Sequence, residues 1–188
     1  MKEEYVLEIR GRTYSHRHYF AQEGFHFVKR SYGRSYWQKK CDNRNLCLMY
    51  QTYCKENRLR CNVYESRYLR DHSYRNVYMQ RIKGRRKYLF CAYCGIPKRI
   101  ETITVDHIIP VKKAKYTRMA KWLMKQFSIK DVNDYANLCA SCKHCNSRKG
   151  TKMGMWLLRG YLGRYQWLWM IRWGVRLCVA GFLLAFLF

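Results

Sequence analysis

Two pairs of cysteines with the same spacing constrain this chain more than any other feature. Cys91 and Cys94 form one C-x2-C pair, and Cys142 and Cys145 form a second pair after a long insert. Thiolates at this spacing bind one tetrahedral cation from two points of the chain, and four sulfur ligands favour zinc without an open coordination position. The sequence therefore predicts a closed, structural zinc site that joins two distant segments.

Other residues near the second pair leave alternatives open. Cys139 precedes Cys142 by three residues and forms a competing C-x2-C pair, and His144 lies inside the second pair. The all-cysteine set is the simpler ligand set. Free cysteine is commonly a small, buried hydrophobe, and intervals of six or seven residues do not suit a zinc knuckle. We therefore expect a packing role rather than a metal for four further cysteines: Cys41, Cys47, Cys54 and Cys61.

The chain is strongly basic. It holds 38 Lys and Arg against 12 Asp and Glu among 188 residues, a formal net charge of +26. Basic side chains that neutralise phosphates release counterions, so this excess indicates a polyanionic partner. The 17 Tyr, 8 Phe and 6 Trp interleaved with the basic residues are typical of phosphate contacts combined with base stacking. A nucleic acid is the predicted partner; loose contact with ribosomes or anionic lipid is the alternative.

A set of polar residues lies between and just after the cysteine pairs. Asp106-His107-Ile-Ile-Pro follows the first pair, Asn137-Leu138 comes later, and Asn146 and Lys149 follow Cys145. The ordered set C-x2-C, D-H-I-x-P, N-L, C-x2-C-N-x-x-K resembles the HNH endonucleases of the ββα-metal class. The resemblance covers about residues 88–153, with asparagine at the place of the second histidine. The interval from Asn137 to Asn146 also resembles the HNH domains of CRISPR effector nucleases.

The resemblance implies a role for each matching residue. His107 is the expected general base, because a neutral imidazole can deprotonate water near neutral pH. Asp106 and Asn146 are the expected ligands of one catalytic Mg²⁺ or Mn²⁺. Asn137 is expected to tie down the loop that carries the base. The implied activity is metal-dependent hydrolysis of DNA, with RNA not excluded; the alternative is a zinc-stabilised nucleic-acid-binding module without cleavage.

Basic residues around this motif are the predicted nucleic-acid contacts. Several of them follow Pro110, where many family members have a Gly-rich stretch. The mode of substrate binding therefore does not follow from the resemblance. A helix over 114–127 would place Met119, Trp122, Leu123 and Phe127 on its apolar face, with Lys121 and Lys125 on the polar side. The predicted nucleic-acid-binding residues are Lys112, Lys113, Lys115, Arg148 and Lys149.

These motifs predict an α+β chain of three regions. A basic, aromatic-rich region over 1–85 would mix a small α/β part with a helical part and target nucleic acid. The ββα-metal domain with its structural zinc would occupy 86–153. An apolar tail, expected to be helical, would follow over 154–188. Apolar periodicity and turn residues predict the local structure. The expected strands are 4–9, 25–28, 36–37 and 102–107, the expected helices 14–23 and 43–70, and the expected linker 71–90 with the basic run 83–87.

The tail leaves three interpretations. The apolar run 177–188 would be about 18 Å long as a helix, shorter than a hydrocarbon core of about 30 Å. Extension back to Tyr165 gives enough length but includes Arg172 and Arg176. A membrane anchor, an interfacial helix and a helix packed on the protein are all compatible, with a preference for packing or surface association through 165–188. The first residues precede no apolar run, so we expect a cytoplasmic protein, and its size and charge suit a bacterial or phage mobile element.

Overall fold

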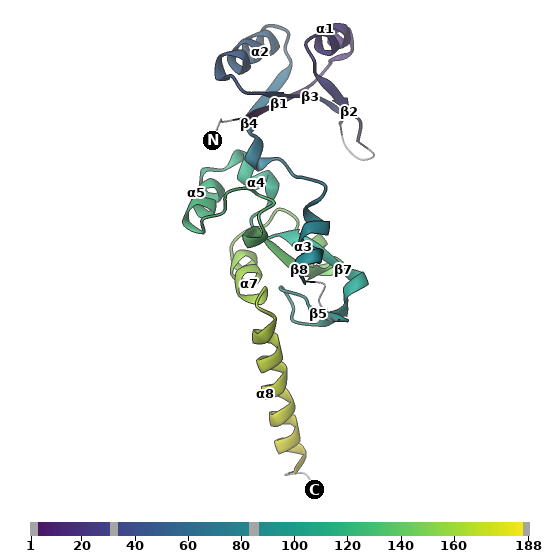
Figure 1. Ribbon diagram of the computed structural model, residues 1–188, viewed down its shortest axis with the longest axis vertical. Helices are drawn as coiled ribbons and strands as arrows, with labels where there is room; N and C mark the ends of the chain where they lie inside the picture. Colours follow the sequence, from purple (N-terminus) through teal and green to yellow (C-terminus); the bar gives the residue numbers. More distant parts are fainter. Residues whose placement is uncertain (1–3, 31–33, 83–86, 186–188) are drawn as a thin grey trace. The chain divides into compact units, whose positions relative to one another are not determined.

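A computed structural model of the chain describes residues 4–30, 34–82 and 87–185 (Figure 1). The chain divides into two compact units, Met1–Leu69 and Arg70–Phe188. Both units mix helices with antiparallel strands, which confirms the predicted α+β class.

The first unit is a four-stranded antiparallel sheet in the order β2-β3-β1-β4, with α1 and α2 packed on one face. The predicted first strand, first helix and two following strands are all present. The elements are β1 (Tyr5–Arg10), a 3-10 helix (Tyr14–His16), α1 (Arg17–Gln22), β2 (His26–Val28), β3 (Tyr36–Cys41), α2 (Arg44–Glu56), β4 (Arg60–Glu65) and a 3-10 helix (Ser66–Tyr68).

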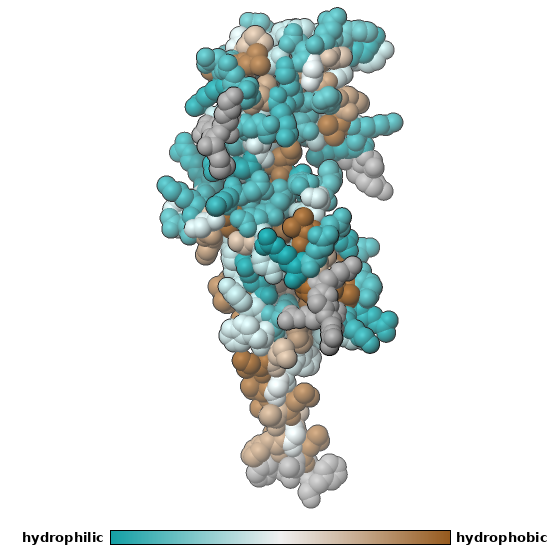
Figure 2. Space-filling view, viewed as in Figure 1, coloured by the Kyte–Doolittle hydropathy of each residue, from teal (hydrophilic) through white to brown (hydrophobic). Residues whose placement is uncertain are grey.

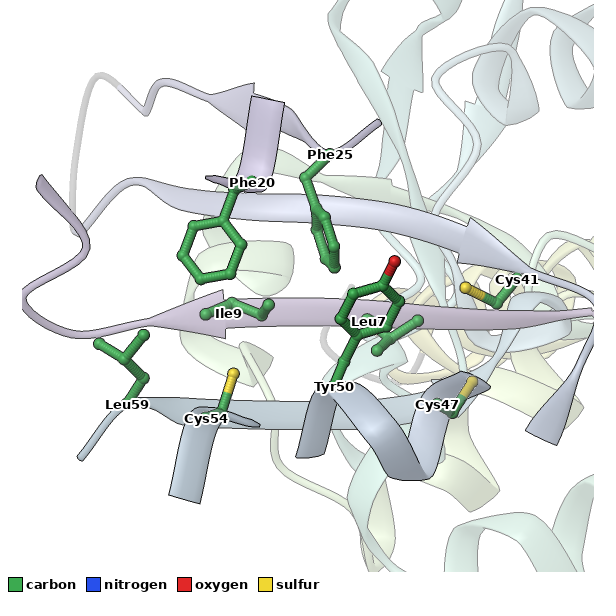
Figure 3. Packing of buried hydrophobic residues seen from close by; sticks show 9 residues of the cluster. All are labelled: Leu7, Ile9, Phe20, Phe25, Cys41, Cys47, Tyr50, Cys54 and Leu59. Carbon is green, nitrogen blue, oxygen red and sulfur yellow. The ribbon is translucent and has the colours of Figure 1, made fainter. Parts of the chain in front are cut away.

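Alternate side chains of the central strand build the core of this unit. Leu7 and Ile9 point from β1 toward the helices, where Phe20 of α1 and Tyr50 of α2 pack against them (Figure 3). Side chains two residues apart share one face of a strand, and side chains three or four apart share one face of a helix. Each fully buried side chain of this size stabilises the fold by about 1.5–3 kcal/mol.

The predicted helix over 43–70 is wrong beyond Glu56. Arg58 adopts a left-handed conformation with φ 53°, which reverses the chain, and the following residues form β4. The edge of β1 accepts this strand in antiparallel register from Tyr5 opposite Glu65 to Arg10 opposite Arg60. Cys54 and Cys61 are seven residues apart, so a spacing that suits one helix face also suits the end of a helix and a returning strand.

The cysteines of this unit behave as packing residues. Cys41, Cys47 and Cys54 are free and buried in the core (Figure 3). Burial raises the pKa of the Cys47 thiol to about 11, so the thiol is protonated at neutral pH.

The second unit is built around two hairpins. β5 pairs with β6 and β7 pairs with β8, both antiparallel, and α6 follows β8 directly. This ββα order is the expected one. The elements are α3 (Tyr74–Ile82), β5 (Tyr88–Phe90), β6 (Pro97–Arg99), a 3-10 helix (Ile100–Thr102), β7 (Ile103–His107), α4 (Val111–Tyr116), α5 (Arg118–Gln126), a 3-10 helix (Tyr135–Asn137), β8 (Leu138–Cys142), α6 (Lys143–Lys149), α7 (Met155–Gly163) and α8 (Gln166–Ala185).

The segment expected as a linker contains α3, which belongs to the core of the second unit. Tyr78 is 3% exposed and packs with Leu89 and Ile103. The guanidinium of Arg75 donates to the carbonyl of Ile103 at 3.1 Å, on the edge of β7 that faces away from β8. Tyr74, Tyr78 and Ile82, spaced four residues apart, lie on the packed side of α3, whereas its arginines are exposed. The exposed basic residues made this segment resemble a linker. Most of the basic run, residues 83–86, lies outside the described residues.

The insert between β7 and β8 differs from the predicted helix over 114–127. Thr117 is extended (φ −117°, ψ 132°) and separates α4 from α5. Ala120 and Met124 face the interior of the unit, whereas Met119 and Trp122 are 60% and 57% exposed. The predicted apolar face was therefore wrong, because large apolar residues were assigned to the core and the small alanine was overlooked.

The first part of the tail packs on the second unit. α7 passes so close to the first cysteine pair that a Cβ on Gly163 would lie 1.9 Å from the carbonyl oxygen of Ala92. The indole Nε1 of Trp173 donates to the carbonyl of Gly95 at 2.8 Å, and the ring of Trp169 covers the same glycine. Beyond Trp173, α8 exposes apolar side chains (Figure 2). The helix from Gln166 to Leu184 is long and apolar enough to cross a membrane.

Candidate active site and metal centre

The four cysteines of the two predicted knuckles converge. The sulfur atoms of Cys91, Cys94, Cys142 and Cys145 all lie within 4.8 Å of one another. Sulfur ligands around tetrahedral zinc, at bonds of about 2.3 Å, are separated by roughly 3.8 Å. The cluster therefore fits a structural zinc, which would join the turn between β5 and β6 to the start of α6.

Backbone donors prepare this cluster for thiolates. The amide of Cys142 donates to Sγ of Cys91 at 3.3 Å, and the amide of Cys145 donates to Sγ of Cys142 at 3.4 Å. Burial acts to raise the pKa of the Cys142 thiol, but hydrogen bonds with Cys145, Cys91 and Cys94 bring it below its usual value. Burial raises the pKa of the Cys91 thiol to about 11 despite its backbone donors. Cys139 is outside the cluster: its fully buried thiol lies 3.4 Å from the hydroxyl of Tyr93, and burial raises its pKa to about 12.

Asp106, near the end of β7, is held by two donors. The hydroxyl of Tyr93 donates to Oδ2 at 2.6 Å, and the ammonium of Lys149 forms an ion pair with the same oxygen at 2.8 Å. Lys149 also donates to the carbonyl of His107 at 2.8 Å. Both bonds to Asp106 use Oδ2, and no described residue pairs with Oδ1. The carboxylate is thus fixed while one oxygen stays available.

The imidazole of His107 is held in one tautomer by Asn133. Nε2 of His107 lies 3.3 Å from Oδ1 of Asn133. The amide group of Asn133 has its orientation set by two contacts, Nδ2 donating to Asp131 and Oδ1 accepting from the amide of Asp71. Since Oδ1 can only accept, Nε2 carries the proton and Nδ1 carries the lone pair. Nδ1 is buried and has no hydrogen-bond partner among the described residues.

Burial also fixes the charge of this imidazole. His107 is 1% exposed, and the ring of Tyr74 from α3 lies 4.5 Å from it between centroids. Burial, helped by the nearby charge of Arg70, lowers the pKa of His107 to about 4. The imidazole is therefore neutral at pH 7.

Asn137 binds the loop that follows His107. Its side-chain oxygen accepts from the amide of Ile109 at 2.8 Å, and its Nδ2 donates to the carbonyls of Ile109 and Val132. The backbone carbonyl of Asn137 accepts from the amide of Ile108 at 2.7 Å. Asn137 is fully buried. This is the geometry that the expected loop-tying role requires.

Asn146 lies on α6 beside β7. Its Nδ2 donates to the hydroxyl of Thr104 at 3.2 Å. Thr104 and Asp106 are two residues apart on the same strand and so share a face. The side chain of Asn146 is half-buried, and no described residue pairs with its Oδ1. Asp106 and Asn146 therefore each offer one oxygen on this face of the hairpin.

The comparison with protein families agrees with the motif. Residues 91–119 match the family model described as HNH endonuclease. This segment is therefore similar to HNH endonucleases. It contains the first cysteine pair, Asp106, His107 and α4. Neither a curated protein nor a solved structure matches the chain. The HNH match indicates a nuclease-like, nucleic-acid-acting protein.

The second half of the HNH site lies beyond the matched residues. Asn137 and Asn146 reach the site because β8 pairs with β7, which sets Leu138 opposite His107 and Cys142 opposite Ile103. The four-cysteine cluster adds a second connection, between the β5–β6 turn and the start of α6.

Two residues of this site, Tyr93 and Asn133, were not predicted from the sequence. Tyr93 lies inside the first cysteine pair, where its aromatic character and its spacing from a metal ligand could have drawn attention. Asn133 lies in the insert, far along the chain from His107, and no spacing marks it. Both act through contacts that only the folded chain creates.

The predicted nucleic-acid contacts divide into two groups. Lys112 and Arg148 are exposed, and Lys113 and Lys115 are half-buried on α4. Lys149 differs from its prediction, because its ammonium is buried against Asp106 and the backbone of the HNH site. Its contribution lies inside the site, where it fixes the end of β7.

Proposed function

We propose that the chain is an endonuclease that hydrolyses phosphodiester bonds of DNA, with His107 as the general base. The observation that carries this proposal is the state of His107 beside the fixed carboxylate of Asp106. Its Nδ1 bears a lone pair with no partner in the described part of the chain, and its low pKa keeps the ring neutral at pH 7. A neutral imidazole next to a site for a hard cation is the arrangement that hydrolysis of a phosphodiester requires.

The proton of the attacking water would pass to Nδ1 of His107. Asn133 supports this transfer, because its Oδ1 keeps the proton on Nε2 and stabilises the imidazolium that forms. Nδ1 would have to become accessible to water, for example by a displacement of Tyr74, whose ring lies 4.5 Å from the imidazole between centroids. Asn137 acts by position, since it holds the loop on which the base lies.

Asp106 and Asn146 would hold one divalent cation, Mg²⁺ or Mn²⁺, through their free side-chain oxygens. Oxygen donors suit a hard cation, and a small number of protein ligands leaves room for phosphate and water. The bound cation would stabilise negative charge on the scissile phosphate and on the leaving oxygen. Lys149 and Tyr93 keep the carboxylate of Asp106 oriented for this role.

Zinc bound by Cys91, Cys94, Cys142 and Cys145 would be structural. Four sulfur ligands leave no position for water or substrate, and the cluster lies where α6 begins. The metal would fix α6, and with it Asn146, against β7. Exposed basic residues such as Lys112 and Arg148 would contact the phosphate backbone.

The test of this function is cleavage of supercoiled plasmid by the wild-type chain. With Mg²⁺ or Mn²⁺ we expect conversion to nicked DNA, and with both cations omitted we expect none. Omission is preferred to chelation because a chelator would also remove zinc. Intact duplex, nicked and branched DNA after incubation with either cation would contradict the proposal.

A zinc-stabilised nucleic-acid-binding module without cleavage is the second candidate. The burial of His107, only 1% exposed, favours it. Tight, salt-sensitive binding of DNA with no metal-dependent product would select this candidate over the nuclease.

The tail supports a further proposal of membrane association. α8 exposes apolar side chains over the segment Gln166–Leu184, of which 6% is buried. Arg172 and Arg176 stack on Trp169 and Trp173, with guanidinium-to-ring distances of 5.3 and 5.4 Å. Trp and Arg together are typical of the headgroup region, and apolar residues beyond them can enter the hydrocarbon.

A further inference from the structure

An open aromatic groove lies in the first unit, outside the HNH site. It has a volume of about 740 Å³, within the range of pockets that bind small organic groups. All of its lining residues belong to the first unit, from the end of β1 through α1 to β2 and β3. We call it the Trp37 groove, and its functional side chains are Arg12, Tyr14, Arg17, His18, Phe27 and Trp37.

The groove exists because α1 is too short to cover the edge of the sheet. Six residues of helix are about 9 Å long, enough for Phe20 to reach the core but not enough to cover β2. Phe27 and Trp37 are cross-strand partners with ring centroids 5.2 Å apart. Phe27 is 53% exposed and Tyr14 is 78% exposed. Aromatic faces are therefore left open to solvent at one site.

Trp37 also brings an unused hydrogen-bond donor. Its indole Nε1 is buried and has no partner among the described residues. A buried donor without an acceptor is costly, and such groups in folded proteins usually have a partner or a function. Because this atom has no exposed surface, a ligand in the groove could accept from it only after the indole moves.

The charge of the groove is positive. Arg12 and Arg17 line it, and none of its described lining residues is Asp or Glu. The guanidinium of Arg17 stacks on Tyr14 at 4.2 Å from the ring centroid. A flat guanidinium–aromatic pair offers both a stacking surface and a phosphate-binding donor set. The ligand should therefore combine an aromatic ring with negative charge.

We infer that the Trp37 groove binds an unpaired nucleotide of a nucleic-acid strand. The base stacks on the exposed rings of Phe27 and Tyr14, and the adjacent phosphates contact Arg12 and Arg17. A paired base is excluded, because both of its faces are already stacked in a duplex. A nucleic-acid strand is favoured over a free nucleotide, because the net charge of +26 extends along the chain. The inference rests on the proposed function only for the choice of nucleic acid as partner.

The test measures binding of a fluorescent single-stranded oligonucleotide by anisotropy, with the full-length zinc-loaded chain and without Mg²⁺ or Mn²⁺. Tyr14→Ala and Phe27→Ala change exposed side chains outside the packed core, so both variants should fold. Each should weaken binding of the single strand roughly ten-fold, as expected for loss of one base-stacking surface. Arg12→Ala should reduce the salt dependence of binding by about 0.7 in the logarithmic slope, as expected for one lost phosphate contact to a single strand.

Two control variants distinguish binding in the Trp37 groove from the general attraction between a basic chain and nucleic acid. Tyr88→Ala removes an aromatic ring of similar exposure from the second unit, and Arg44→Ala removes an exposed charge from α2. Tyr88→Ala should bind the single strand as the wild type does, and neither Tyr14→Ala nor Phe27→Ala should change binding of a blunt duplex. A mononucleotide should compete at least a hundred-fold less well than the oligonucleotide.

Three results would overturn the inference: single-strand binding unaffected by Tyr14→Ala and Phe27→Ala, equal loss of duplex binding, or a mononucleotide that competes as well as the strand. Because the assay involves no cleavage, a chain that binds through the groove but never nicks DNA would refute the nuclease and retain the groove.

Discussion

Replacement of Lys149 by methionine tests how the HNH site is held together. The side chain of Lys149 is completely buried, and the side chain of Asp106 is 9% exposed. Methionine preserves most of the apolar volume but removes the ammonium. Asp106 then loses its ion-pair partner, and the carbonyl of His107 loses its donor.

The expected cost is large, because removal of one partner leaves a buried charge uncompensated. Such changes cost about 3–5 kcal/mol. Since about 1.4 kcal/mol corresponds to a factor of ten, the equilibrium constant for opening of the β7–β8 pair should rise roughly 100- to 4,000-fold. The matched control is Lys143→Met, the same substitution at an exposed position of the same helix, which should change stability by less than about 0.5 kcal/mol.

Amide hydrogen exchange of peptides from β7 and β8 measures this opening without requiring the two units to unfold together. Addition of Asp106→Asn to Lys149→Met should recover part of the lost protection, because the uncompensated charge is removed while Tyr93 keeps an acceptor. Equal exchange in Lys149→Met and Lys143→Met would refute the assignment of Lys149 to the interior of the site.

Three other changes have defined outcomes. Cys142→Ser should lower the zinc content measured by mass spectrometry from one ion per chain toward zero; retention of a full equivalent would contradict a four-sulfur site. Because the pKa of His107 falls from 6.5 to about 4 on folding, the unfolded chain binds more protons between these values, so stability should fall by up to about 3 kcal/mol as pH drops from 7 to 4. The free energy of unfolding of His107→Gln, measured by urea titration, should lack that portion of the pH dependence. Identical pH profiles of wild type and His107→Gln would count against the buried neutral imidazole. Removal of residues 177–188 leaves Trp169 and Trp173 in place and should abolish flotation with anionic vesicles while zinc content stays unchanged; a truncated chain that still floats would remove the membrane proposal.

The sequence predicted the parts of the site that depend on local spacing. Two cysteine pairs of fixed spacing, and Asp106 next to His107, need only short segments of chain to be correctly placed. The strand that ends at His107 and the helix that carries Asn146 follow from the same local pattern, because α6 begins at the second cysteine pair.

Contacts between residues far apart in the chain could not be predicted from the sequence. Tyr93 and Asn133 reach Asp106 and His107 only after the hairpin and the insert have folded, and no periodicity relates them. Lys149 was assigned to phosphate because a basic residue after a helix start is more often solvated than buried. Its burial depends on a carboxylate that lies 43 positions earlier in the chain.

Errors in secondary structure arose where one pattern suited two structures. Cysteines seven residues apart suit a helix, but the left-handed Arg58 ends α2 and directs the chain into β4. α3 was not predicted because it has one fully buried residue, Tyr78, and the neighbouring Val77 is exposed, so no clear apolar face marks the helix.

Plasmid nicking by wild type, His107→Ala and His144→Ala tests the central claim most directly. His144 is an exposed histidine of the same unit and serves as the matched control. Each protein is incubated with supercoiled DNA and Mg²⁺ or Mn²⁺, and the rate of conversion to nicked product is measured. We predict that wild type and His144→Ala nick the plasmid at similar rates, whereas His107→Ala loses at least a hundred-fold, the lower end of the range for a general base. Cleavage by His107→Ala at the wild-type rate would contradict this prediction.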